Sequence, residues 1–100
     1  MEELKGTATA EQIADWKKKH GDIFKAVVDD SVCYLKTPDR KIMSYVATIP
    51  NNPVRANEVL LQNCWLGGDE SIKTDDEKFF GVTSKLNEII KIKEAEITKL

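Results

Sequence analysis

The sequence predicts an α+β protein that is mainly α-helical, with one short N-terminal helix, a β-hairpin and then three helices, the last of them long. Capping residues and prolines mark the starts of these helices, and glycines mark their ends. Residues 23–35 instead form a β-rich run around an acidic turn. Because 100 residues suffice for one modest core, we expect a flexible N-terminal arm over residues 1–8 and a single α+β domain over residues 9–100.

The first helix is predicted over residues 10–20. Thr9 and Gln12 have the spacing of a capping box, in which each residue satisfies a main-chain donor of the other. Trp16 lies on the apolar face of this short helix. Gly21 follows its last turn, and a glycine is the usual residue just beyond a helix C-terminus.

A β-hairpin is predicted next. Residues 23–28 and 32–35 are rich in β-branched and aromatic side chains, and Asp29 and Asp30 lie between them. Two such runs around a short polar turn are typical of antiparallel strands.

Two further helices are predicted over residues 38–48 and 53–65. Each starts with a proline at its first position, where the missing N–H has no intrahelical partner to lose, and each proline follows a capping residue, Thr37 or Asn52. The glycines at 67–68 are expected to end the second of these helices.

The last helix is predicted to start at a capping box of Thr74 and Glu77 and to continue to the end of the chain. About 25 residues at 1.5 Å each give about 38 Å, which is longer than a domain of this size is wide. Its C-terminal turns should therefore project or meet another subunit, which predicts a homo-oligomer through this helix. The apolar stripe consists of Phe79, Val82, Leu86, Ile89, Ile90, Ile97 and Leu100.

The composition argues against several classes of function. The formal net charge is −2, whereas a duplex-binding domain needs a concentrated basic face, so no nucleic-acid partner is expected. No apolar run approaches the ~20 residues that span a bilayer, and the N-terminus lacks the apolar core of a secretory signal. We therefore expect a cytoplasmic protein without a membrane partner.

No enzymatic or metal-binding motif is present. The single histidine, His20, lies in the last turn of the first predicted helix, where a cation favours the helix dipole. Cys33 and Cys64 lack CxxC spacing and are expected to be reduced apolar fillers. The acidic stretch over residues 69–77 does not fit the ligand spacing of an EF-hand. We expect neither an enzyme nor a cofactor.

Large apolar residues at the ends of elements are the candidates for partner binding. Trp16 and Trp65 are either lids over the core or anchors for a partner, and the sequence leaves both open. Of two adjacent phenylalanines only one can face the core, and Phe80 is assigned to the surface. Ile90 and Ile97 complete this set because the last helix is expected to extend beyond its own core.

Three segments carry a resemblance to a known family: VCYLKTPDRKIMSYV, NEVLLQNCWLGGDESIKTDDE and LNEIIKIKEAEITKL. Together they resemble the small tail assembly chaperones of long-tailed bacteriophages over roughly residues 10–100, a likeness of helix caps and turn residues rather than of a catalytic signature. The resemblance implies a protein of the bacterial host cytoplasm that binds the tape measure protein and keeps it soluble during tail assembly, with the tail tube protein as a second candidate partner.

Two alternatives remain open. A structural subunit of the virion would share the same oligomerising surfaces. A small nucleic-acid-binding regulator is less favoured, because the helix over residues 53–65 carries Arg55 as its only cation, whereas a recognition helix needs several basic residues.

Overall fold

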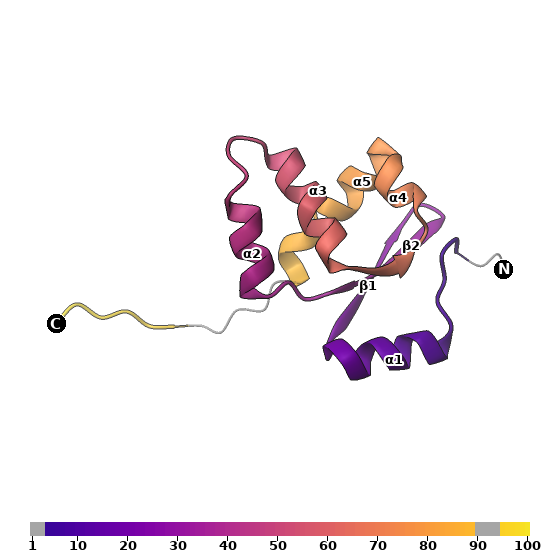
Figure 1. The fold of residues 1–100 in the computed structure, drawn as a ribbon, viewed down its shortest axis with the longest axis horizontal. Coiled ribbons are helices and arrows are strands. Elements are labelled where there is room, and N and C mark those ends of the chain that lie inside the picture. The colour runs from indigo at the N-terminus through magenta and orange to yellow at the C-terminus, as the bar shows by residue number, and fades with distance from the viewer. Residues whose placement is uncertain (1–3, 90–94) are drawn as a thin grey trace.

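Three antiparallel strands form a sheet with helices on both of its faces (Figure 1). The computed structural model describes residues 4–89 and 95–100. The prediction of a chain that combines helices with antiparallel strands is confirmed. In chain order the elements are α1 (Ala10–His20), β1 (Ile23–Val28), β2 (Ser31–Lys36), α2 (Arg40–Ala47), α3 (Pro53–Cys64), β3 (Trp65–Gly68), α4 (Ser71–Thr74), α5 (Asp76–Thr83) and the 3-10 helix η1 (Leu86–Ile89).

β2 is the central strand of the sheet, whose order is β1-β2-β3. It pairs antiparallel with β1 along the whole of both strands, from Ile23 opposite Lys36 to Val28 opposite Ser31. The predicted hairpin is therefore confirmed, and its turn holds Asp29 at a positive φ of 54°. β3 pairs antiparallel with the other edge of β2. Among the described residues, no strand pairs with the outer edge of β1.

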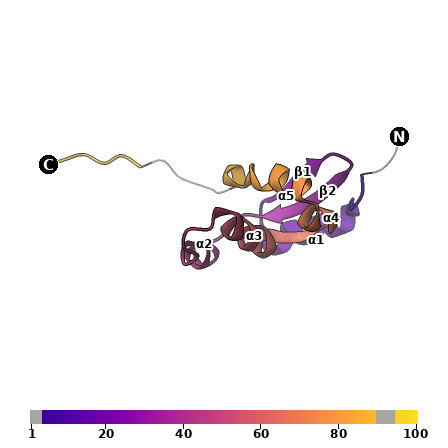
Figure 2. The same ribbon diagram turned by 90° about the horizontal axis from the view of Figure 1, so that it is seen from above.

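The two faces of the sheet are covered by different helices. Cys33 and Leu35 of β2 lie in the main core together with residues of α3, α4, α5 and η1. Tyr34 faces the other side, where its ring centroid lies 5.4 Å from that of Trp16 in α1. Figures 1 and 2 show α1 and α5 on opposite sides of the sheet. The other buried members of the core are Leu60, Leu61, Cys64, Ile72, Phe79, Val82, Leu86 and Ile89.

α1 and α3 lie where the sequence predicts them. Thr9 Oγ1 accepts a hydrogen bond from the Gln12 N–H at 3.1 Å, and the Thr9 N–H donates to Gln12 Oε1 at 3.0 Å, so the capping box is confirmed. Asn52 Oδ1 accepts from the Arg55 N–H at 3.0 Å, and Pro53 is the first helical residue, as predicted.

The predicted start of α2 is wrong by two residues. Asp39 caps this helix, since its Oδ1 accepts from the Ile42 N–H at 2.8 Å, and Arg40 is the first helical residue. The hydroxyl of Thr37, the predicted cap, is buried and makes no hydrogen bond within the described part of the chain. Pro38 is also buried and belongs to the extended segment after β2. Asp39 caps α2 in place of Thr37 because a carboxylate is a stronger N-cap than a threonine hydroxyl.

The prediction of one long C-terminal helix is wrong for the residues that the structure describes. α5 ends at Thr83, η1 follows, and residues 95–100 form neither helix nor strand. A run of Gly, Val, Thr and Ser gives the end of α5 low helix propensity, and the hydroxyls of Thr83 and Ser84 donate back to carbonyls of their own helix at 2.9 and 2.8 Å. Leu86 and Ile89 are buried against the core after this break.

The segment before α5 also differs from the prediction. The capping box of Thr74 and Glu77 is not formed as the start of one helix, because α4 is a separate single turn and Asp75 caps α5 by accepting from the Lys78 N–H at 3.2 Å. The glycines at 67–68, expected to lie just after a helix, belong instead to β3. The glycine pair is typical of the end of a helix, but strand pairing with β2 determines the conformation of these residues.

The described part of the N-terminal arm makes defined contacts. The Lys5 N–H donates to the Asp30 carbonyl at 2.8 Å, and the Val32 N–H donates to the Lys5 carbonyl at 2.9 Å, which forms a parallel bridge beyond the end of β3. Gly6 has a φ of 92°, and a Cβ at this position would lie 2.2 Å from the Asp69 nitrogen. Only glycine fits this close approach without a shift of the backbone.

Candidate functional site

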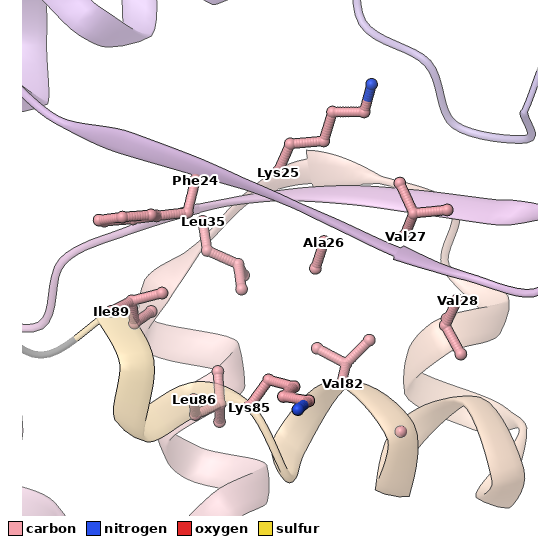
Figure 3. Close-up of a pocket in the computed structure, with 11 residues that line it drawn as sticks. Phe24, Lys25, Ala26, Val27, Val28, Leu35, Val82, Lys85, Leu86 and Ile89 are labelled. Atoms are coloured by element: carbon pink, nitrogen blue, oxygen red, sulfur yellow. The ribbon is translucent and has the colours of Figure 1, made fainter.

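An apolar groove lies between β1 and the α5–η1 segment (Figure 3). Its volume is about 520 Å³. From the sheet, the side chains of Phe24, Ala26 and Leu35 point toward the helical segment, and Val82 and Leu86 point back toward the sheet. The groove is bordered by Phe24, Lys25, Ala26, Val27, Val28, Leu35, Gly81, Val82, Lys85, Leu86 and Ile89.

The alternation of β1 produces this groove. Successive strand side chains point to opposite faces, so Phe24, Ala26 and Val28 line it, whereas the side chains of Lys25 and Val27 point away from α5 (Figure 3). Ala26 is small and leaves space between its larger neighbours.

At one end of the groove, α5 comes close to the strand. A Cβ on Gly81 would lie 3.0 Å from Val28 Cγ2, so the absence of a side chain at Gly81 permits this approach. The helix and the strand therefore meet at the Val28 end of the groove.

The edge of β1 beside the groove is available for main-chain hydrogen bonds. In an antiparallel ladder, alternate residues turn their N–H and C=O groups away from the neighbouring strand. Val28 and Ser31 flank the two-residue turn and form a hydrogen-bonded pair. The next pair along the strands, Val27 and Val32, is therefore a non-hydrogen-bonded pair, and its N–H and C=O groups point away from the neighbouring strand. The Val32 N–H accordingly bonds to Lys5 rather than to β1. By the same alternation, the main-chain groups of Lys25 and Val27 face the open edge.

The lining of the groove is mostly apolar. Among its described lining residues, Lys25 and Lys85 are the only ones with ionisable side chains. The remaining lining residues are apolar or glycine, and they can bury apolar side chains of a ligand. Phe24, Ala26 and Val28 are half-buried, so part of their apolar surface stays accessible.

A polar cluster of Asp30, Ser31, Asp69, Ser71 and Lys78 lies at the hairpin end of the sheet. Lys78 Nζ donates to Ser31 Oγ at 2.8 Å, to Asp30 Oδ1 at 3.1 Å and to Ser71 Oγ at 3.2 Å. Ser31 Oγ and Ser71 Oγ donate to Asp69 Oδ2 at 2.7 and 2.8 Å. The hydrogen bond with Lys78 lowers the pKa of Asp30 to about 2, and the hydrogen bond from Ser31 lowers the pKa of Asp69.

The Ser31–Lys78 pair does not have the properties of a catalytic dyad. A lysine that activates a serine must be neutral, whereas the hydrogen bond with Asp30 raises the pKa of Lys78 and keeps it charged. Ser31 is fully buried, so a substrate cannot reach its hydroxyl. The cluster instead connects the hairpin turn to α4 and α5.

The structure places the five candidate residues in different surroundings. Trp16 is half-buried against Tyr34, and Trp65 is half-buried with Lys73 Nζ 4.3 Å from its ring centroid.

Phe80 is 53% exposed while its neighbour Phe79 is 8% exposed, which confirms that Phe80 faces the surface. Ile97 is 98% exposed, and Ile90 lies outside the described residues. Trp16 and Phe80 belong to helices on opposite sides of the sheet, so the five do not form one site.

The two cysteines are free and buried. Burial raises the pKa of each thiol, of Cys33 and of Cys64, to about 11. Within residues 4–89 and 95–100, no group of three or more His, Cys, Asp or Glu side chains is placed to hold a metal ion. No helix in the same ranges has the length and apolar character needed to cross a membrane.

Comparisons of the chain with protein-family models, with curated proteins and with solved structures found no match. The interpretation of the groove therefore rests on its shape, on its apolar lining and on the open edge of β1. The groove is not among the features predicted from the sequence, although Phe24, Ala26 and Val28 have the alternation of one strand face. The missing information was that α5 ends at Thr83 and lets Leu86 and Ile89 fold against β1.

Proposed function

We propose that this protein is a non-catalytic binding protein that receives an apolar segment of a client protein in the groove between β1 and α5. The observation that supports this proposal is the position of the groove directly beside the outer edge of β1, with which no strand of the described residues pairs. An extended client segment can add to such an edge through main-chain hydrogen bonds while alternate side chains enter the groove. Main-chain pairing then supplies affinity, and the groove selects apolar side chains.

The proposed client is the tape measure protein of a long-tailed bacteriophage, and the proposed role is that of a tail assembly chaperone in the bacterial host cytoplasm. The client assignment rests on the three resembling segments. A chaperone of this kind needs exposed apolar side chains and no active site. Phe80 and Ile97 are exposed apolar residues of this kind, and Val27 on β1 is 52% exposed. Self-association and contact with the tail tube protein are parts of the same proposal.

Co-expression with the tape measure protein of the same gene cluster tests the proposed function. We expect the tape measure protein to move into the soluble fraction and to co-purify with this chain. Ala26→Asp places a charge in the groove and should abolish co-purification, because a carboxylate buried in an apolar site loses its hydration. Val54→Asp is the matched control, since Val54 is 48% exposed on α3, outside the groove lining.

Circular dichroism of both variants must match that of the unsubstituted protein. If the client stays insoluble with an excess of the unsubstituted protein, the chaperone assignment is wrong. If the chain is instead retained in purified virions, a structural subunit is the better assignment.

A further inference from the structure

We infer that the groove beside β1 binds the C-terminal segment, residues 95–100, of a second copy of this chain. The bound segment would add as a fourth strand to the open edge of β1, and two copies would exchange segments. The inference rests on the proposed use of the groove as a binding surface, but it does not depend on any client.

The shape of the site specifies an extended segment of about the length of β1. β1 has six residues, and its outer edge is unpaired among the described residues. The small side chain of Ala26, between Phe24 and Val28, leaves space in the groove on the side that faces Val82 (Figure 3). On the opposite face of the same strand lies the exposed Lys25, which favours an acidic neighbour.

Residues 95–100 meet these requirements. They form no helix or strand of their own, and they are exposed throughout. The side chains of Ile97 and Leu100 are essentially fully exposed. In an extended segment that directs Ile97 into the groove, Glu96 and Thr98 point to the other face, beside Lys25. Lys99 lies on the same side as Ile97, and its aliphatic stem can follow the rim of the groove while its ammonium group stays in water. With Ile97 in the groove, Glu96 therefore lies on the face that carries Lys25.

A second copy fits better than the segment's own groove. In both Figure 1 and Figure 2, residues 95–100 extend away from the sheet and from α5. Ile89, at the end of η1, lines the groove. A two-fold arrangement can therefore place each C-terminal segment across the groove of the other copy, with the same contact made twice. Self-association by this route does not need the C-terminal helix expected from the sequence.

Sedimentation velocity of the full chain, without any client, tests the inference over low to high micromolar concentrations, because two six-residue strands form a small interface. We expect a reversible dimer. Ile97→Asp should weaken the dimer by at least about tenfold, because it removes the central apolar contact. Thr98→Ala is the control in the same segment and should leave the dissociation constant unchanged.

A charge reversal tests the register without touching the core. Lys25→Glu should weaken the dimer a few-fold, as expected for an exposed pair, and combining it with Glu96→Lys should restore the affinity. Lys25 is exposed, so this variant keeps the proposal testable even where a groove substitution unfolds the protein.

Mixing two defective variants tests the exchange between copies. The Ile97→Asp variant has an intact groove, and the Ala26→Asp variant has an intact C-terminal segment. Each should be monomeric alone, whereas an equimolar mixture should form a heterodimer. A chain that is monomeric at every concentration, or a dimer insensitive to Ile97→Asp and Lys25→Glu, would overturn the inference. If the chain is a monomer that still solubilises the client, the inference is wrong and the proposed function stands. If the chain forms the segment-exchanged dimer but does not solubilise the client, the inference stands and the proposed function is wrong.

Discussion

Lys78 Nζ donates to Ser31 Oγ over 2.8 Å and thereby joins α5 to the first residue of β2 across 47 positions of sequence. The Lys78 side chain is 15% exposed, and it also pairs with Asp30 at 3.1 Å in the hairpin turn. These contacts lie near the close approach of Gly81 to Val28 in the same helix and hairpin. The polar cluster thus fixes α5 against the hairpin and sets the width of one end of the groove.

The acid side of the stability profile should depend on this cluster. The pKa of Asp30 is about 2 in the folded protein against an ordinary value of 3.8, and the pKa of Asp69 is also lowered. A carboxyl group with a depressed folded pKa contributes stability above its unfolded pKa, and this contribution is lost as pH falls toward the folded value. Stability should therefore fall as pH drops from about 4 to about 2.

Urea denaturation at a series of pH values measures this effect. The unsubstituted protein should lose stability over that interval, and Asp30→Asn should have a lower midpoint at neutral pH and a flatter decline toward acid. Asp15→Asn is the matched control, because Asp15 is an exposed carboxylate in an ion pair with Lys19 on α1. An identical pH profile for Asp30→Asn and the unsubstituted protein would contradict the assigned role of the cluster.

The two adjacent phenylalanines should separate stability from binding. Phe79→Ala removes a buried core side chain and should cost about 3–5 kcal/mol of unfolding free energy. Phe80→Ala removes an exposed ring and should change stability by about 0.5 kcal/mol or less. If Phe80 is a client anchor, its truncation should weaken the client complex by about 2 kcal/mol.

Chemical denaturation and client affinity are measured on the same two variants. The rings of Phe79 and Phe80 lie 5.6 Å apart, so their mutual contact is common to both truncations and cancels in the comparison. A large loss of stability in Phe80→Ala would mean that its ring supports the core.

Two glycines with positive φ should differ in their tolerance of alanine. Gly6→Ala must bring a methyl group 2.2 Å from the Asp69 nitrogen, whereas a Cβ on Gly21 would meet nothing within 4 Å. Both substitutions carry the backbone strain of a positive φ, and Gly6→Ala adds the steric conflict with the Asp69 nitrogen, which Gly21→Ala lacks. We expect Gly6→Ala to be the more destabilising by at least about 1 kcal/mol, measured by urea denaturation. Equal effects would show that the contact between residues 4–8 and the sheet adds nothing to stability.

The parts of the fold that the sequence predicted are those set by short-range chemistry. The capping box of Thr9 and Gln12 and the proline start after Asn52 depend on residues within one helical turn, and the hairpin depends on a two-residue turn. Such interactions are complete within a few residues. They could therefore be identified from the sequence alone.

The parts that were missed depend on partners far along the chain. β3 has four residues and two glycines, and it exists because β2 offers an edge to it. The long apolar stripe after Phe79 predicts one continuous helix, but the strand face of Phe24, Ala26 and Val28 provides a surface against which Leu86 and Ile89 fold. The groove, which lies between these two groups, could not be predicted until both were placed.

The attachment of α1 has a consequence for how the protein opens. None of the residues of α1 is fully buried, and the ring contact of Trp16 with Tyr34 is its main aromatic contact to the sheet. Five consecutive residues of β2, from Ser31 to Leu35, are by contrast buried. Opening free energy follows the apolar surface that each unit buries, so α1 forms a local unfolding unit of low stability. We therefore expect its amide protons to exchange with solvent through detachment of this helix alone, and those of β2 to exchange only when the whole domain unfolds.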